Sequence, residues 1–444
     1  MPAMPIILPS VLRARVKPEY FQAIPIIIEA EPDIGVNFLA GTVSEQLSTK
    51  IGKTIPSMNM FSMILPRDML GDLAAIEGVR SISLDRTHFA LEVPAMGLHQ
   101  TIRATMEGII PTSEAIKRVN VPALHRENIT GRGVNVAVLD TGIDLTNPQI
   151  AGGAAKMSTI KAQPTGDDEN GHGSWCGTCI KGKPFRDSLT GLLATGVAPD
   201  CNLTSIKVLG FGIGTGMTSD IMEAMELAVA QGNEIISMSL GSEGSEDEDL
   251  DPMVRMINQY AETHPKVIFV VANGNSGPGP RTVGIPAVAE KAVSVGSWGI
   301  IDNDIAYFSS RGPTVQAARI KPDICGCGGG RHQEGTKPEE NLWSGTAFGS
   351  MLDPIVDRVE NGFTAIKGTS MATPQVAGIL ALWKQMFPEL TTDVAKGIFQ
   401  SMSGRVKDPN IGWGLIDATW ILSASESPQA QPSKIAQTSA TPRF

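Results

Sequence analysis

The sequence predicts an α/β protein in which a mainly parallel sheet carries helices on both faces, in three layers, after a small α+β domain. Three observations support this fold class. Apolar strand-like runs alternate with helical patterns over residues 134–386, as in βαβ units. The runs are rich in β-branched residues, which is typical of a parallel sheet covered on both faces. The chain of 444 residues, 42% of them hydrophobic, is long enough for a large core and more than one domain.

Residues 1–85 form the predicted α+β domain. Their periodicity indicates strands at 24–30, 60–65 and 79–84 and a helix at 68–77. The next segment has no clean period and contains the breakers Pro94, Gly97, Gly108 and Pro111. Residues 86–112 are therefore expected to be a linker.

Residues 113–422 form the predicted sheet domain. Its first clear strand, 134–140, ends in Asp140 and a turn. Further strands are expected at 205–209, 235–238, 267–272 and 292–296, and helices at 219–230, 252–263 and 371–386. Residues 423–444, rich in Ser, Pro, Gln and Ala, are expected to be a disordered tail.

Three residues in this domain can carry nucleophilic chemistry. Ser370 stands at a glycine-rich turn that opens an apolar helix, with Gly368 allowing the turn and Pro374 placed in the first helical turn. A serine there is otherwise only an N-cap. His172 lies between glycines ahead of a small-residue helix, and Asp140 ends a strand where α/β folds build their sites. The order Asp, His, Ser is that of the subtilisin type of triad.

The chain resembles the subtilisin-like serine proteases over most of residues 115–418. Besides the segments of Asp140, His172 and Ser370, the likeness extends in family order to 122–125, 130–131, 196–199, 237–241, 308–313, 321–323 and 412–417. The resemblance implies that Ser370 is the nucleophile, His172 its general base and then acid, and Asp140 the group that orients the imidazole. Such a set hydrolyses peptide bonds through an acyl-enzyme.

The resemblance also implies an oxyanion donor and a substrate-binding edge. Asn273 and Asn275 compete for the donor role at the end of an apolar strand. Alignment on Gly274 selects Asn275, with the Ser370 backbone N–H as its companion; either asparagine could instead be a turn residue. Ser239, Leu240, Gly241 and Gly274 are expected to bind substrate, the first three by pairing with its backbone as an added strand.

An acidic run of residues 243–251 follows this edge. If the run lies at the rim of the pocket for the substrate residue before the scissile bond, its negative charge could favour Lys or Arg at that substrate position. The alternative is a solvated acidic lead into the helix that begins near Pro252, favoured by the helix dipole.

The N-terminal segment resembles the ferredoxin-like inhibitory propeptide of the same family, which acts as folding chaperone and inhibitor. This implies an intramolecular propeptide and a processing site within 86–112. The alternative is a permanent accessory or partner-binding domain.

Composition excludes some partners. A formal charge of −10 argues against nucleic acid, and no apolar run of about 18 residues predicts a membrane span. The expected partners are protein or peptide substrates.

The N-terminus lacks a basic region ahead of its apolar stretch. Five cysteines leave at least one unpaired, and Cys176, Cys179 and Cys201 suggest buried thiols, so a cytoplasmic location is expected, with secretion as the alternative.

No cofactor is expected for the chemistry. Zinc at Cys176 and Cys179 lacks an adjacent ligand His, although Cys176 matches a free thiol near the catalytic His in some relatives. Calcium is common in the family, and oxygen ligands are available, but no site is assigned; the candidates are Asp144, Asp167, Asp168 and Glu169. Trp175 and Ser174 depart from the family pattern, and residues 326–362 are longer than usual and could be a flap or partner surface.

The predicted function is a serine endopeptidase made as a self-processing zymogen. The rival hypothesis is a catalytically silent or permanently inhibited scaffold that binds partners through its N-terminal domain. An esterase or peptide ligase on the same triad is a third possibility.

Overall fold

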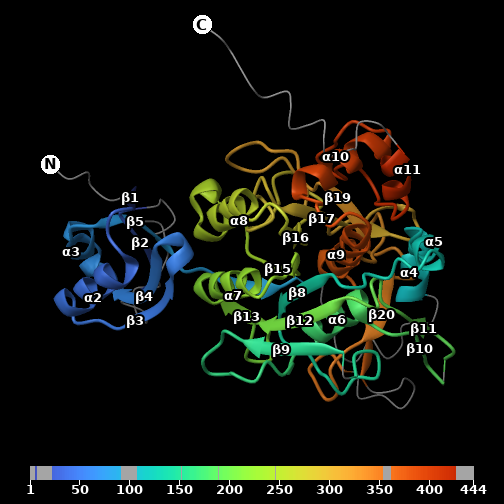
Figure 1. Ribbon diagram of the computed structural model, residues 1–444, viewed down its shortest axis with the longest axis horizontal. Coiled ribbons are helices and arrows are strands. Elements are labelled where there is room, and N and C mark those ends of the chain that lie inside the picture. Colours follow the sequence, from blue (N-terminus) through green and yellow to red (C-terminus); the bar gives the residue numbers. More distant parts are fainter. Residues whose placement is uncertain are drawn as a thin grey trace, which may run out of the picture.

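The computed structural model describes residues 6–7, 23–91, 108–151, 153–188, 190–245, 247–353 and 362–426. Figure 1 shows two lobes, a small one built from the N-terminal segment and a larger one that contains the rest. The helices α7 and α8 of the large lobe face the small lobe.

In its described residues, the small lobe is a five-stranded sheet with two α-helices. Its elements are β1 (Ile6–Ile7), β2 (Ala23–Ala30), α2 (Val36–Gln46), β3 (Ile51–Ile55), β4 (Met60–Pro66), α3 (Leu70–Ala75) and β5 (Val79–Leu84). The strand order β1-β5-β2-β4-β3 is antiparallel except for the β1/β5 pair. Without β1, this is the order of a ferredoxin-like βαββαβ unit. The sequence had indicated neither α2 nor β3.

The large lobe contains an eight-stranded, mainly parallel sheet. Its path is β18-β17-β16-β14-β8-β12-β9, and β19 pairs with β17. The strands are β8 (Asn135–Asp140), β9 (Ala154–Ser158), β12 (Asn202–Lys207), β14 (Ile235–Met238), β16 (Ile268–Ala272), β17 (Val293–Gly299), β18 (Asp304–Ile305) and β19 (Ile324–Cys327). Only the β17/β18 pair is antiparallel.

Helices cover both faces of this sheet. They are α4 (Thr112–Arg118), α5 (Val121–Arg126), α6 (His172–Lys181), α7 (Thr218–Ala230), α8 (Pro252–Thr263), α9 (Thr369–Met386), α10 (Thr392–Ser403) and α11 (Trp420–Glu426). In β8, Val136 and Val138 pack into the apolar cluster under α6 and α9, whereas Ala137 and Leu139 pack into the cluster under α7 and α8. This alternation along one strand makes the three layers.

Smaller sheets complete the large lobe. β6 (Thr87–Ala90) lies between β13 (Thr215–Met217) and β15 (Leu240–Gly241), and it is antiparallel to both. The other pairings join β10 (Phe185–Arg186) to β11 (Leu193–Ala194), and β20 (Asn341–Gly345) to β21 (Phe363–Ile366) and β7 (Ile109–Pro111).

The observed boundaries differ from the expected ones. The segment 86–112, expected as a linker, contributes β6 and β7 to sheets of the large lobe. Both strands are too short to show a period of their own, and their partners lie far away in sequence. At the other end, α11 continues to Glu426, four residues into the expected tail. The remainder of that tail, and the linker residues 92–107, lie outside the described residues.

The two lobes share one apolar cluster. Ile27, Ile55, Met58 and Met60 of the small lobe pack into the cluster that lies under α7 and α8. In β2 the neighbours Ile26 and Ile28 instead enter the small lobe's own core. One strand therefore serves its own domain with one face and the interface with the other.

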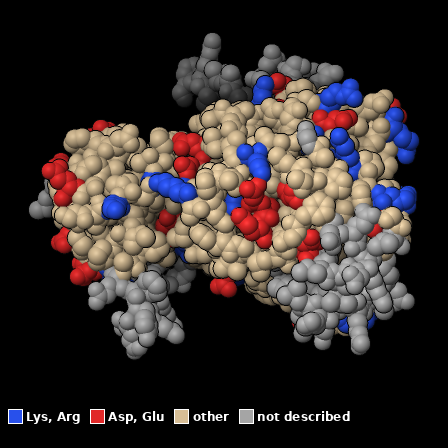
Figure 2. Space-filling view, turned by 90° about the horizontal axis from the view of Figure 1, so that it is seen from below, with Lys and Arg blue, Asp and Glu red and all other residues tan. Residues whose placement is uncertain are grey.

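None of the helices in the described ranges has the length and hydropathy of a membrane-spanning segment. Figure 2 shows Lys and Arg interspersed with Asp and Glu over both lobes of the face in view.

Candidate active site

Asp140 and His172 lie together in a buried hydrogen bond. His172 Nδ1 is 2.7 Å from Asp140 Oδ1, and both side chains are fully buried. Burial of the ring opposes its charge, but the Asp140 carboxylate outweighs it and raises the pKa of His172 well above the ordinary value. The same carboxylate fixes which ring nitrogen faces it, so Nε2 points away from Asp140.

Close backbone approach brings these two residues together. Asp140 ends β8, and His172 is the first residue of α6. A Cβ on Gly173 would lie only 2.3 Å from Gly142 O, so only glycine allows the start of α6 to pack against the turn after β8. Asp168 secures this arrangement by accepting the backbone N–H groups of residues 170, 171 and 174.

Ser370 lies at the start of α9 and is fully buried. Pro374 is six residues into this helix, not in its first turn as expected, so it supplies no amide to the Ser370 carbonyl. That carbonyl instead accepts the Ser239 hydroxyl at 2.9 Å and the Cys176 thiol at 3.7 Å. The Ser370 hydroxyl in turn donates to Ser239 O at 3.0 Å.

The structure therefore holds Ser370 and His172 near one common neighbour, Cys176, and no direct hydrogen bond joins them. Cys176 Sγ is 3.9 Å from His172 Nδ1 and also contacts the Ser370 carbonyl. His172 Nε2 is buried and has no hydrogen-bond partner among the described residues. A buried ring nitrogen without a partner is unusual and is available for a proton from a neighbouring hydroxyl.

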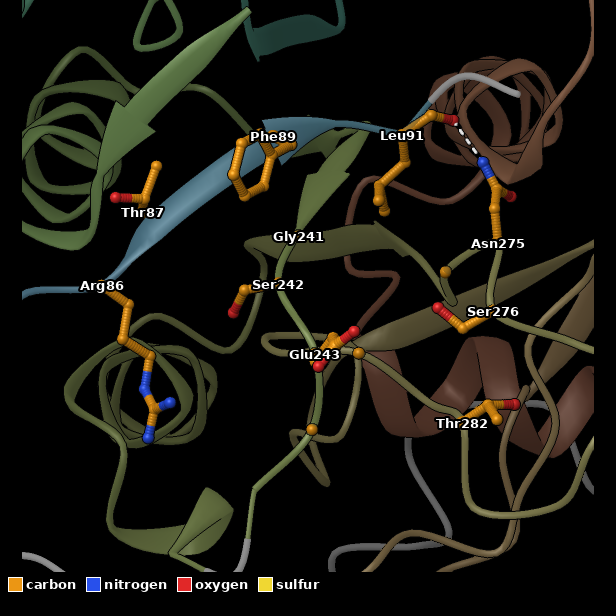
Figure 3. Close-up of a pocket in the computed structure, with 13 residues that line it drawn as sticks. Arg86, Thr87, Phe89, Leu91, Gly241, Ser242, Glu243, Asn275, Ser276 and Thr282 are labelled. Atoms are coloured by element: carbon orange, nitrogen blue, oxygen red, sulfur yellow. Dashed lines mark hydrogen bonds between the residues drawn. The ribbon is translucent and has the colours of Figure 1, made fainter. Parts of the chain in front are cut away.

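The two asparagines have different surroundings. Asn273 Nδ2 donates to Ser310 O at 2.6 Å inside the core. Asn275 Oδ1 accepts both the N–H and the hydroxyl of Thr369 at 2.9 Å, which turns Nδ2 toward the cleft. There Asn275 Nδ2 donates to the Leu91 carbonyl at 2.7 Å (Figure 3). Gly274 separates the two with a φ of +109°, a conformation that suits glycine.

The expected substrate-binding edge is occupied by the chain's own strand β6. Leu240 pairs with Ala90 and Gly241 with Phe89, while Ser239 O accepts the Leu91 N–H at 3.3 Å. A cleft of about 480 Å³ lies along this strand, with Gly274, Asn275 and Glu243 among its lining residues (Figure 3). All four residues expected to bind substrate therefore lie at or beside β6.

The acidic run leads into α8, as one expectation had it, but much of it is not solvated. Glu243 is exposed, whereas Asp247, Glu248 and Asp251 are buried, and Asp251 caps α8 by accepting the N–H groups of Met253 and Val254. Asp247 and Asp251 form ion pairs with Arg86. Burial of these carboxylates is tolerated because this arginine, distant in sequence, supplies the opposite charge.

The cysteines are free and buried, and the candidate calcium ligands are already engaged. Burial raises the pKa of the Cys176 thiol to about 11. Asp140, His172 and Cys176 are the only group in the described ranges whose ligand atoms could surround one metal ion. The acidic residues considered for calcium bond instead to protein donors: Asp144 to Thr146 and Phe348, Asp167 to Lys156, Asp168 to Thr141 and Ser174, and Glu169 to Lys207.

The long segment 326–362 contacts the His172 loop. Thr346 Oγ1 donates to Gly171 O at 2.8 Å, and the Leu352 N–H donates to Asn170 O at 2.9 Å. Residues 354–361 lie outside the described residues. The described part of the segment thus supports the loop that carries His172.

A doubly covered parallel sheet whose site combines an Asp–His pair with a serine at a helix start defines a serine protease with the chain order Asp, His, Ser. Residues 131–414 match the subtilase family, and the chain belongs to that family. It is 34% identical to serine protease AprX of Bacillus subtilis over 344 residues, which cover 72% of each chain. It is 33% identical to subtilisin Savinase of Lederbergia lenta over 68% of this chain and 96% of that protein.

A solved structure has the same fold. Fervidolysin from Fervidobacterium pennivorans, described as a keratinolytic enzyme related to subtilisin, matches with a TM-score of 0.70 at 17% identity. The match covers 95% of this chain and 63% of the fervidolysin chain.

Sequence reasoning missed several residues of this site. Leu91 and Arg86 lie in the segment expected to be a linker, and Thr369, which orients Asn275, had no assigned role. The alternation Thr87-His88-Phe89-Ala90 was the available signal for a strand, but four residues do not distinguish a strand from a loop.

Proposed function

We propose that this serine protease is made as a zymogen that cleaves itself after Leu91. The observation that carries the proposal is the position of the Leu91 peptide group. Its carbonyl accepts the Asn275 amide at 2.7 Å, and its N–H meets Ser239 O, the same atom that accepts the Ser370 hydroxyl. This is how a bond about to be cleaved would lie in an acyl-transfer site.

The proposed chemistry uses Ser370, His172 and Asp140. The Ser370 hydroxyl turns from Ser239 O and attacks the Leu91 carbonyl carbon, while its proton passes to His172 Nε2. The carbonyl oxygen becomes an oxyanion held by Asn275 Nδ2 and the Ser370 N–H. Collapse breaks the bond between Leu91 and Glu92, and His172 gives its proton to the leaving amine. Water then releases Leu91 as a carboxylate and restores the serine.

Asp140 has an orienting role in this scheme. It holds His172 by the Nδ1 bond of 2.7 Å and stabilises the charge that the ring gains. The buried position of the pair excludes water and strengthens this attraction.

The small lobe is the proposed inhibitor after cleavage. Glu29 accepts both terminal nitrogens of Arg255 on α8, at 2.7 and 2.8 Å. Lys53 pairs with Asp220 and Glu223 on α7, and the Ser57 N–H donates to Glu226. Together with the shared apolar cluster, these contacts keep β6 in the cleft once its peptide bond is broken.

Intact mass and casein hydrolysis test the proposal on the full chain and on Ser370→Ala. We expect the wild type to yield a new N-terminus at Glu92 and to digest casein, and the variant to do neither. A wild type that digests casein while keeping its full mass would refute self-cleavage and leave the protease. Full mass, no hydrolysis and no labelling by a fluorophosphonate would favour the inhibited scaffold.

We also propose a reducing compartment for the protein, because its five cysteines are free and buried. A count of thiols in the denatured chain tests the chemical basis of this proposal, since a disulfide would lower the count.

A further inference from the structure

The strand β6 is anchored at its far end by an arginine in a buried acidic site. Figure 3 shows the strand running from Arg86 at one end of the cleft to Leu91 at the other. Arg86 Nη2 lies 3.0 Å from Asp247 Oδ1 and 3.1 Å from Ser245 Oγ, and Arg86 Nε lies 3.4 Å from Asp251 Oδ2.

The backbone fixes which residue enters this site. The Thr218 N–H donates to Arg86 O at 2.9 Å, and the Arg86 N–H donates to Thr218 Oγ1 at 3.2 Å. Beyond them Thr87 pairs with Met217. An extended segment whose last carbonyl contacts Asn275 therefore places its sixth residue, counted back from that carbonyl, beside Asp247 and Asp251.

The acidic side of the site belongs to the protease lobe. With Arg86 in place, the side chains of Asp247 and Asp251 are 3% and 1% exposed, and they come from the turn that leads into α8. Two carboxylates this deeply buried are stabilised by a cation nearby: burial raises the pKa of Asp251, and the charge of Arg86 opposes that rise. Once residues 1–91 leave, the arginine that supplies this cation leaves with them.

Capping of α8 accounts for the burial of only one of the two Asp251 carboxylate oxygens. Asp251 Oδ1 accepts the two helix N–H groups, whereas the guanidinium lies against Oδ2. Asp247 Oδ1 accepts the Arg86 guanidinium and the Ser245 hydroxyl. One oxygen of each carboxylate therefore faces the guanidinium in the cleft.

We infer that Asp247, Asp251 and Ser245 form a subsite that selects protein substrates with an arginine six residues before the scissile bond. The inference rests on the proposed binding of β6 as a substrate. It replaces the expected Lys or Arg preference at the residue directly before the bond, where this chain itself presents Leu91.

Matched peptides test the subsite on the self-processed full chain, with active sites counted by a fluorophosphonate. The first peptide copies residues 86–95, and the second carries citrulline, a neutral isostere, in place of arginine. We expect kcat/KM to be about tenfold higher for the arginine peptide, because charge-assisted hydrogen bonds to a buried carboxylate are lost in the other. The ratio should fall to near one in Asp247→Asn.

Asp249→Asn is the matched control, since it removes the same charge from the same run. Asp249 pairs with Arg319 and not with Arg86, so this variant should keep the tenfold ratio. Equal cleavage of both peptides by the wild type overturns the inference, even if Asp247→Asn fails to fold. Loss of the ratio in both variants equally also overturns it, because a general field would then be the cause. Labelled enzyme that cleaves neither peptide refutes the proposed binding of β6 itself.

Discussion

Pro374 affects the candidate active site because it leaves the Ser370 carbonyl without its hydrogen bond within α9. Because it has no N–H, the Ser370 carbonyl four residues earlier lacks its helical partner. Ser239 and Cys176 supply donors in its place, and Ser239 O also accepts the Ser370 hydroxyl. One imino acid thus ties the start of α9 to Ser239, on the edge expected to bind substrate, and to Cys176 beside His172.

The pH dependence of hydrolysis should follow His172. The neutral ring is the proposed base, and the Asp140 carboxylate raises its pKa well above 6.5 despite burial. Activity should therefore be lost as the pH falls through this raised value, so the acid limb of kcat/KM should lie on the alkaline side of 6.5. A pH profile on a neutral peptide measures it. An acid limb below 6.5 would contradict the prediction.

Asn275→Ala should lower kcat by about two to three orders of magnitude with little change in KM, which is the penalty known for loss of the corresponding donor in a subtilisin. Asn273→Ala provides the contrast, since its amide bonds to Ser310 O within the core. It should reduce the melting temperature and leave kcat nearer the wild-type value. Steady-state kinetics and thermal melts distinguish the two variants. Equal losses of kcat would count against Asn275 as the oxyanion donor.

At the scale of elements, the small lobe is held by side chains that reach across to α7 and α8. Burial alone would raise the pKa of Glu29, but hydrogen bonds from Arg255 and Ser81 hold it below the ordinary value. The carboxylate is therefore charged at neutral pH and pairs with Arg255. The interface combines this pair with an apolar cluster, so the pair contributes orientation as well as affinity.

Glu29→Gln and Arg255→Gln should each shorten the lag between self-cleavage and full casein hydrolysis. If the two residues are coupled, the double variant should shorten the lag, relative to the wild type, by less than the product of the two single effects, with a coupling energy on the order of 1 kcal/mol. The lag times of the wild type, the two single variants and the double variant, taken from progress curves, complete this double-mutant cycle. Lys266→Gln breaks a surface pair with Glu389 away from this interface and should leave the lag unchanged. Independent effects of the two changes would show that the pair is not coupled.

At the scale of the whole molecule, the lobes form one folded unit around a shared cluster, and the thiols lie deep inside it. All five cysteines are free and buried, and burial raises the pKa of Cys201 to about 12. Thiolate is the reactive form, so both low exposure and raised pKa protect these residues.

The native Ser370→Ala chain should accordingly show almost no thiol that reacts rapidly with Ellman's reagent. The same chain in denaturant should show all five cysteines as reactive thiols. The Ser370 substitution prevents autolysis during the assay. One fast thiol in the native state would identify an exposed cysteine, and a lower count in denaturant would reveal a disulfide.

The sequence by itself determined the class of this protein. Its α/β alternation predicted β14 and α8 at their observed bounds, and the order of Asp140, His172 and Ser370 pointed to the subtilase family, to which the chain belongs. Such features are legible because each is local: a strand, a helix or a motif depends on neighbouring residues. Alignment on Gly274 was enough to propose Asn275 over Asn273, but the sequence did not indicate the hydrogen-bond partners of either asparagine.

Only the tertiary structure decided what fills the cleft. β6 becomes a strand because β13 and β15, more than a hundred residues away, provide its hydrogen bonds, and nothing within 86–91 requires it. Asp247 and Asp251 are buried rather than solvated because Arg86 reaches them across the fold. Short strands and buried charges obtain their stability from distant partners, and a pattern read along the chain does not contain those partners.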